Sequence, residues 1–274
     1  MAVKKVLIIG GTGRLGLVLS RVLKENGYEA ISIGSNKLNL QDENVQTELM
    51  KYSPDYIVHA AALSSVDRCE REPDLAYSIN GYGTEKVSLA AKRMNVLLLY
   101  ISTDYVFDGE NPPYSENDKA NPLSVYGKSK LLGEQFAREI CSSVILRVSW
   151  LFGPEGNDFV DFVAHGEGTL RVVPYQVSKP TYTVDLSYAI MKIIQKKATG
   201  IYHFANPPTV SRLDWVRTIL MVSGKDRKIR RVDWEELGVD AERPLDSSLS
   251  ASKYEREFGK IPSWREGLRE CLNA

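Results

Sequence analysis

Short runs of apolar residues alternate with helix-like repeats along the first 150 residues of the chain. The apolar runs are rich in Val, Ile and Leu, and they predict strands over 4–10, 28–34, 55–61, 96–102 and 143–149. The intervening segments place apolar residues three and four positions apart, and this spacing predicts helices over 14–27, 41–52, 73–94 and about 124–140.

Strands that are apolar along their whole length and separated by helices are typical of a parallel sheet covered on both faces. The crossover connections between such strands are expected to be right-handed. The pattern therefore predicts an α/β fold, a doubly wound parallel sheet of the Rossmann type.

The pattern loosens after Trp150, where residues 151–180 are rich in Gly and Pro. Beyond them, periodicity predicts a strand over 200–205 and helices over 184–197, 211–224 and about 263–272. We therefore expect a first domain over residues 1–150, to which residues 180–205 return. A smaller, interleaved C-terminal lobe is expected to take up most of residues 151–274.

The charge composition argues against a nucleic-acid partner. The 274 residues include 35 Lys and Arg and 35 Asp and Glu, so the net charge is zero. Nucleic-acid binders normally carry a basic excess or a basic stripe. The basic run KDRKIRR at 225–231 is short, and we interpret it as a solvated strand edge. A net charge near zero also permits self-association, so a homodimer is compatible with the sequence.

The apolar and cysteine patterns bear on the compartment. No apolar stretch approaches the about 18 residues of a membrane span, and glycine interrupts the N-terminal apolar run too early for a signal peptide. Cys69, Cys141 and Cys271 are too widely spaced for a metal motif or a disulfide framework. We therefore expect a soluble, cytoplasmic protein with no membrane partner.

A glycine-rich turn joins the first predicted strand to the first predicted helix. In IIGGTGRLG, Gly10, Gly13 and Gly16 have the spacing G-x-x-G-x-x-G. Glycines let the backbone approach a pyrophosphate, to which the helix N-terminus presents unpaired N–H groups. A tight structural turn is the alternative. The strand before the turn and the helix after it favour a dinucleotide site within residues 1–150.

The end of the second predicted strand bears on which dinucleotide binds. Ser35, Asn36 and Lys37 lie there without a carboxylate, whereas NAD sites often use Asp or Glu to accept the ribose 2′-hydroxyl. The Arg14 guanidinium could face the same point and would suit a 2′-phosphate. We therefore predict NADP(H) as the cofactor, with NAD(H) as the alternative. Alternatively, the Arg14 side chain could simply face solvent.

Two groups of residues are candidates for chemistry. Tyr126 and Lys130 lie four positions apart, on one face of a predicted helix. An isolated pair with this spacing more often lies on an exposed helix face. Ser102, Thr103 and Asp104 follow the fourth strand, at the sheet edge where doubly wound folds place their chemistry. These residue types also cap turns well.

Together, the three motifs resemble the extended branch of the short-chain dehydrogenase/reductase superfamily. Further stretches resemble the dTDP-4-dehydrorhamnose reductase family: PDYIVHAAALSSVDRCE (54–70), STDYVFDG (102–109), NPLSVYGKSKLLGE (121–134), LRVSWLFGPEGNDFV (146–160), PTYTVDL (180–186) and RPLDSSL (243–249). These stretches occur in order, so the resemblance covers nearly the whole chain.

The resemblance implies a catalytic triad of Thr103, Tyr126 and Lys130. Tyr126 would donate a proton to a carbonyl oxygen as hydride arrives, and Thr103 would hydrogen-bond the same oxygen. Ser102 is the alternative hydroxyl. The Lys130 ammonium is expected to lower the pKa of the Tyr126 phenol, which is about 10 in free tyrosine, and to reach the nicotinamide ribose.

The resemblance also implies two sets of binding residues. Those expected to bind the cofactor are Gly10, Thr12, Gly13, Arg14, Leu15, Gly16, Ser35, Asn39, Leu40, Ala60, Ala61, Ala62, Ser102, Tyr126 and Lys130. Those expected to bind a nucleotide-sugar substrate are Ser64, Val66, Thr103, Asp104, Tyr105 and Trp150. For Asp104, a supporting role behind the site and a turn cap are the alternatives.

The chain departs from the family pattern at three places. His59 replaces the usual Asn, and Asn39 stands where an Asp is frequent. Leu17 and Val18 occupy the region where some members carry a glutamate that binds magnesium, so we predict no metal there.

The leading functional hypothesis is the NADPH-dependent reduction of the 4-keto group of dTDP-4-dehydro-L-rhamnose to dTDP-L-rhamnose. One alternative is an epimerase or reductase of another nucleotide sugar with the same triad. A second alternative, from another class, is a non-catalytic NADP-binding regulatory subunit of the methionine adenosyltransferase type. The intact triad of Thr103, Tyr126 and Lys130 favours an enzyme.

Overall fold

Six parallel strands form the central sheet of the computed structural model, which describes residues 3–155 and 158–273. Their order is β10-β5-β4-β3-β1-β2. The strands are β1 (Lys5–Ile9), β2 (Glu29–Ile33), β3 (Tyr56–His59), β4 (Leu97–Thr103), β5 (Ser143–Val148) and β10 (Gly200–His203). The chain reverses its direction of winding between β1 and β3, which is where such folds bind ligands. The predicted doubly wound α/β fold is confirmed.

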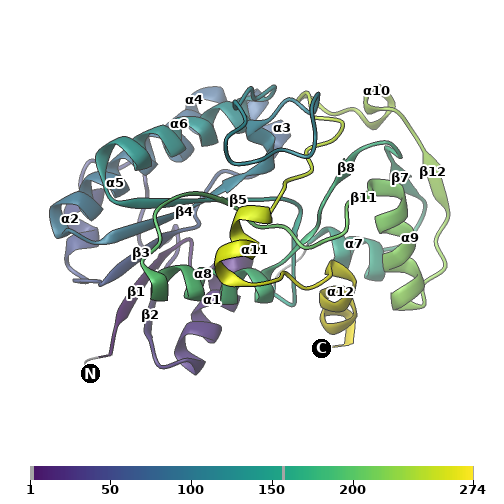
Figure 1. The fold of residues 1–274 in the computed structure, drawn as a ribbon. Coiled ribbons are helices and arrows are strands. Elements are labelled where there is room, and N and C mark those ends of the chain that lie inside the picture. Colours follow the sequence, from purple (N-terminus) through teal and green to yellow (C-terminus); the bar gives the residue numbers. More distant parts are fainter. Residues whose placement is uncertain (1–2, 156–157, 274) are drawn as a thin grey trace.

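Helices cover both faces of this sheet, which explains why its strands are mostly apolar (Figure 1). In β1, Val6 and Ile8 join the core on one face, while Leu7 and Ile9 join the core on the other. The first core includes residues of α1 (Arg14–Glu25), α8 (Thr183–Lys196) and α11 (Ser252–Phe258). The second includes residues of α2 (Val45–Met50), α5 (Gly83–Met94) and α6 (Val125–Ile140).

The helix expected over 73–94 is interrupted. It consists of α4 (Pro73–Ala76), a π-helical turn η1 (Tyr77–Tyr82) and α5. The π turn directs the Asn80 amide at the loop after β3, where it exchanges hydrogen bonds with Leu63, and it also donates to Ser129 Oγ on α6 at 3.0 Å. Periodicity does not reveal such a turn, because its extra residue is accommodated inside an otherwise regular helix.

The C-terminal lobe packs beside the carboxyl ends of the strands, and β10 returns from it to the sheet (Figure 1). Its core includes the buried aromatic residues Phe152, Trp215 and Trp264. Its helices are α7 (Phe159–His165), α9 (Arg212–Ser223), α10 (Trp234–Leu237) and α12 (Trp264–Asn273). Its short strands pair as β6 (Leu151–Phe152) with β9 (Thr181–Tyr182), β7 (Leu170–Val172) with β12 (Ile229–Arg231), and β8 (Val177–Ser178) with β11 (Val210–Ser211).

Five short helical elements in the described part of the chain were not expected from the sequence. They are α3 (Val66–Arg71), α7, α10, α11 and the 3₁₀ turn η2 (Asp104–Val106). Each is too short to display a helical repeat of apolar residues, so periodicity carries no signal for it.

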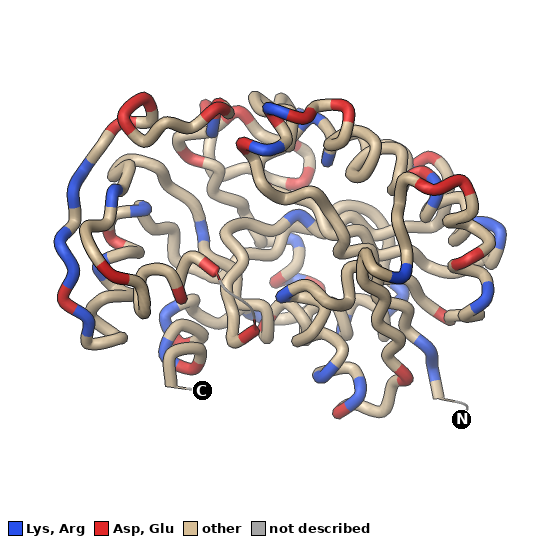
Figure 2. The backbone as a smooth tube through the Cα atoms, turned by 180° about the vertical axis from the view of Figure 1, so that it is seen from behind, with Lys and Arg blue, Asp and Glu red and all other residues tan. Residues whose placement is uncertain are grey.

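Acidic and basic residues are interleaved over the molecule rather than gathered into one field (Figure 2). The basic run includes β12, whose Arg230 pairs with Glu236 at 2.6 Å. Within the described part of the chain, no helix is long and apolar enough to span a bilayer.

Helix α6 packs closely against η1 and β4, and this contact yields a prediction. A Cβ at Gly133 would lie 2.5 Å from both the Asn80 carbonyl oxygen and the Tyr100 hydroxyl. Gly133→Ala should therefore lower the free energy of unfolding by about 1–3 kcal/mol, although alanine favours helices more than glycine does. Urea titration followed by circular dichroism measures the change.

Lys128→Ala, at an exposed position of the same helix, is the matched control and should stay within about 0.5 kcal/mol of wild type. A Gly133→Ala protein as stable as this control would contradict the close packing.

Candidate active site

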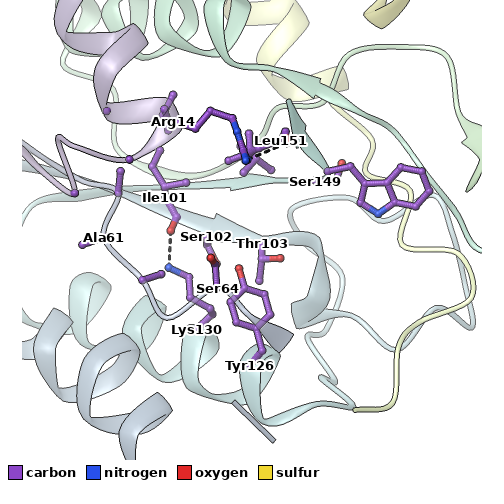
Figure 3. A pocket seen from close by; sticks show the side chains of 18 of the residues that line it. Arg14, Ala61, Ser64, Ile101, Ser102, Thr103, Tyr126, Lys130, Ser149 and Leu151 are labelled. Carbon is purple, nitrogen blue, oxygen red and sulfur yellow. Dashed lines mark hydrogen bonds between the residues drawn. The ribbon is translucent and has the colours of Figure 1, made fainter. Parts of the chain in front are cut away.

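A cavity of about 540 Å³ opens at the carboxyl ends of the central strands. Six segments line it: the glycine loop, the ends of β2, β3 and β4, the first turns of α6, and the turn between β5 and β6. Figure 3 shows their side chains converging on this space. Residues from 10 to 151 thus meet at one edge of the sheet.

The glycine loop fits a dinucleotide. A Cβ on Gly10 would lie 2.6 Å from the Ala61 backbone nitrogen, and one on Gly16 would lie 2.3 Å from the Gly10 carbonyl oxygen. Helix α1 begins after Gly13 with no side-chain cap and no acidic residue in its first turn. Its N-terminus therefore presents backbone donors and a positive dipole end, which suit a diphosphate.

All but two of the residues expected to bind the cofactor line this cavity. The exceptions, Asn39 and Leu40, line a smaller cavity of about 300 Å³. Ser35, Ala61 and Ala62 line both cavities, so the two adjoin beside the end of β2. The individual roles of these residues in cofactor binding remain predictions.

Arg14 points across the cavity toward the turn after β5 (Figure 3). Its Nη1 donates to the Leu151 carbonyl oxygen at 3.4 Å, and its Nε lies 3.4 Å from Asp158 Oδ2. The side chain therefore joins the glycine loop to the C-terminal lobe. Its assignment to a 2′-phosphate remains a prediction.

Tyr126 and Lys130 lie at the floor of the cavity rather than on an exposed helix face. Ser124 caps α6 by accepting a hydrogen bond from the Gly127 backbone N–H at 3.2 Å, so Tyr126 falls in the first turn. The Tyr126 hydroxyl points toward Thr103 (Figure 3). Lys130 is 3% exposed, and its Nζ donates to the Ile101 carbonyl oxygen at 2.7 Å.

The pKa of the Tyr126 phenol is shifted upward overall, not downward as expected from Lys130. Burial raises the pKa of Tyr126, and the nearby Thr103 hydroxyl opposes that shift only in part. Burial also lowers the pKa of Lys130 to about 7, against the attraction of Glu134. The cost of removing both groups from water thus outweighs the Tyr–Lys attraction that the spacing suggested.

Asp104 is a buried carboxylate, 2% exposed, enclosed by hydroxyl groups. It accepts hydrogen bonds from Thr103 Oγ1 at 3.1 Å, Ser178 Oγ at 3.2 Å and Ser247 Oγ. Burial raises its pKa to about 6 despite these donors. The turn η2 is capped by the Thr103 hydroxyl, which accepts from the Tyr105 N–H. Of the two alternatives for Asp104, the geometry therefore favours the supporting role over the turn cap.

The expected substrate residues divide into two groups. Ser64, Thr103, Asp104 and Trp150 line the cavity, whereas Tyr105 and Val66 do not. Tyr105 lies behind Tyr126, with the two rings edge to face and their centroids 6.1 Å apart. Trp150 has a φ of +39°, a left-handed conformation that is strained for an aromatic residue and that often marks a functional site.

Two residues that the sequence did not suggest organise this wall of the cavity. The Arg212 guanidinium stacks on the Trp150 ring, 3.5 Å from its centroid, and donates to Gln176 Oε1 at 3.1 Å and 3.3 Å. Gln176 Nε2 in turn donates to the Tyr105 hydroxyl at 3.0 Å. Burial lowers the pKa of Arg212 to about 10, so it stays cationic at neutral pH. Neither residue belongs to a motif, so no local signal could have identified it.

The buried Asp104 carboxyl yields a pH-dependent prediction. Its pKa is about 6 in the folded protein, whereas an unfolded Asp titrates near 3.9, so folding favours the protonated form. That contribution to stability is present at low pH and is lost as the pH rises through about 6. Between about pH 7 and pH 4, wild type should gain roughly 2 kcal/mol relative to Asp104→Asn.

Urea unfolding of both proteins across this pH range provides the measurement. Asp118→Asn is the control, because hydrogen bonds from Ser115 lower the pKa of the exposed Asp118 carboxyl. Wild type should lose stability relative to that variant as the pH falls. A difference between wild type and Asp104→Asn that does not change with pH would contradict the shifted pKa.

Comparison with known proteins places the chain in a family. A model described as RmlD substrate binding domain matches residues 4–274. The chain is 41% identical to the spore coat polysaccharide biosynthesis protein SpsK of Bacillus subtilis, over 98% of this chain and 96% of that protein. It is 35% identical to the dTDP-4-dehydrorhamnose reductase of Aggregatibacter actinomycetemcomitans, over 97% of each.

The fold and the cofactor agree with a solved structure. The dTDP-4-dehydrorhamnose reductase of Bacillus anthracis in complex with NADP superposes with a TM-score of 0.95 at 34% identity, covering 99% of each chain. The predicted family and the predicted NADP(H) cofactor are therefore confirmed. The chain belongs to the RmlD family, and it is an NAD(P)H-dependent oxidoreductase that acts on sugar nucleotides.

Proposed function

We propose that the chain reduces the 4-keto group of dTDP-4-dehydro-L-rhamnose to give dTDP-L-rhamnose, with NADPH as the reductant. The observation that carries this proposal is the meeting of the Thr103 and Tyr126 side chains at the floor of a cavity with a dinucleotide-binding glycine loop. Relatives named dTDP-4-dehydrorhamnose reductase support it at 30–35% identity. The 41% identity to SpsK leaves the sugar to be tested.

The nicotinamide cofactor, when bound, supplies hydride to the carbonyl carbon. The chain supplies the proton, which passes from Tyr126 Oη to the carbonyl oxygen. Because burial raises the pKa of Tyr126, the phenol holds its proton until negative charge develops on that oxygen. Thr103, toward which the Tyr126 hydroxyl points, lines the same cavity and would position that oxygen. Lys130, one helical turn away, supports the loss of the proton through its positive charge.

The sugar would lie between Trp150 and the polar side chains of Ser64 and Asp104, all of which line the cavity. An indole face suits the apolar side of a deoxysugar, and a carboxylate accepts hydrogen bonds from sugar hydroxyls.

Arg212 is a cation at this wall, stacked on the Trp150 ring, and its pKa is lowered by burial and by the nearby charge of Arg243. We assign the diphosphate of the substrate to Arg212.

These assignments give the two parts of the chain different binding roles. Residues 1–150 would bind NADP(H), with residues 180–205 completing the sheet, and residues 151–274 would mainly bind the sugar nucleotide. A cytoplasmic location and a homodimer remain predictions.

Substrate turnover tests the proposal directly. Purified protein with NADPH should lose absorbance at the nicotinamide band when dTDP-4-dehydrorhamnose is added, and NADH should be compared in parallel. Tyr126→Phe should lower kcat by about 100- to 10,000-fold, because it removes the proton donor, while leaving the Kd for NADPH within about threefold. Equal turnover in that variant would exclude Tyr126 as the acid.

A panel of other nucleotide sugars distinguishes the alternatives. Faster turnover of another keto sugar would replace the proposed substrate. NADPH binding without turnover of any of them would favour a regulatory subunit.

Arg212 gives a separate prediction about the diphosphate. Arg212→Leu should raise the KM for the sugar nucleotide at least about tenfold, because a charge-assisted contact is lost. The KM for NADPH should remain unchanged. Arg217→Leu is the control, since Arg217 is exposed on the same helix and pairs with Asp214. If the two variants had equal KM values, the assignment of Arg212 would fail.

A further inference from the structure

Glu134 lies on α6 one turn beyond Lys130 and about two turns beyond Tyr126. It is 1% exposed, and its carboxylate is fully engaged. Oε1 accepts from Ser102 Oγ at 2.5 Å and from Arg147 Nε at 2.9 Å, and Oε2 accepts from Arg147 Nη2 at 2.7 Å. The proposed mechanism makes no use of this carboxylate, although Ser102 and Lys130 both line the active-site cavity.

We propose that Glu134 is a positioning residue for the reductase reaction: its carboxylate, fixed by Arg147 and Ser102, keeps the buried Lys130 in the ammonium form. This inference rests on the proposed function only in that Lys130 must be cationic for the proton transfer. In this role the Glu134 carboxylate stabilises the positive charge of Lys130, in addition to holding α6 against the sheet.

The positive charge of Lys130 depends on the Glu134 carboxylate, because the other neighbours described below are neutral. Its Nζ lies 4.0 Å from the centroid of the Tyr100 ring on β4, and the charge of Lys130 also acts on His59 on β3. Burial lowers the pKa of His59 to about 3 and raises those of Tyr100 and Tyr126, so all three are neutral at physiological pH. Among these neighbours, the charge that favours the Lys130 ammonium is that of Glu134.

A chain of contacts fixes the Glu134 carboxylate. His203 Nδ1 lies 3.1 Å from the Tyr114 carbonyl oxygen, which can only accept, so Nδ1 carries the ring proton. Nε2 is then free to accept from Arg147 Nη1 at 3.4 Å. The Arg147 guanidinium also lies over the Phe107 ring. A buried ion pair that is anchored in this way keeps its negative end at a constant distance from Lys130.

The pH dependence of activity separates this role from a purely structural one. Activity that needs the Lys130 ammonium is lost as the pH rises through the pKa of that group. Without the Glu134 charge the pKa should fall by about one unit, so Glu134→Gln should move the basic limb of kcat/KM to lower pH by that amount. Well above both values, this shift means about tenfold lower activity. Glu134→Asp keeps the negative charge, so its basic limb should lie close to that of wild type.

A substrate-independent measurement keeps the inference separate from the proposed function. In enzyme labelled with ¹³C at lysine Cε, the Lys130 signal is the one absent from Lys130→Arg. Its titration midpoint should be about one unit lower in Glu134→Gln than in wild type. An unmoved midpoint in the folded variant would overturn the inference. If the midpoint moves while wild type fails to turn over the proposed substrate, the inference stands and only the proposed function fails.

Arg147→Gln gives the same test with the opposite sign and covers the case in which Glu134→Gln does not fold. Loss of the Arg147 charge leaves Glu134 uncompensated, so the Lys130 midpoint should rise. A midpoint that falls, or that does not move, would overturn the proposal.

Discussion

The close approach of α6 to the sheet is the constraint on which the rest of the site depends. At Gly133 the helix lies so near that the Asn80 carbonyl oxygen and the Tyr100 hydroxyl occupy the space a side chain would need. This contact sets the height and rotation of α6 over β4. It thereby places Tyr126 opposite Thr103, and Lys130 against the Ile101 carbonyl oxygen. The chemistry of the site thus follows from packing two turns away from the reacting hydroxyl.

Burial then decides the charge of each group that the packing brings together. It raises the pKa of Tyr126, lowers that of Lys130 to about 7 and raises that of Asp104 to about 6, so each is shifted toward its neutral form. Lys130 and Asp104 therefore titrate near neutral pH, whereas the Tyr126 phenol holds its proton. The C-terminal lobe contributes to this environment, because Ser178 and Ser247 complete the shell around Asp104. The site is therefore complete only when the lobe is folded against the sheet.

Local sequence signals were sufficient for much of the fold and for the cavity. The apolar runs predicted the strands of the sheet to within a few residues, because a strand buried on both faces is apolar along most of its length. The glycine spacing and the Tyr126–Lys130 spacing predicted two of the segments that meet in the cavity. Short elements such as α3 escaped prediction, since they are shorter than the repeat that would reveal them.

The sequence by itself determined the strands, the long helices and the residues delivered to the sheet edge, because these depend on contacts between near neighbours along the chain. Only the tertiary structure decided the direction of Arg14, the shifted pKa of Tyr126 and the contacts of Arg212 with Trp150 and Gln176. Each of these depends on burial or on a partner far away in the chain, as with Ser247 and Asp104, which are 143 positions apart. Desolvation and long-range pairing leave no periodic trace in a sequence, since they arise only when the folded chain excludes water.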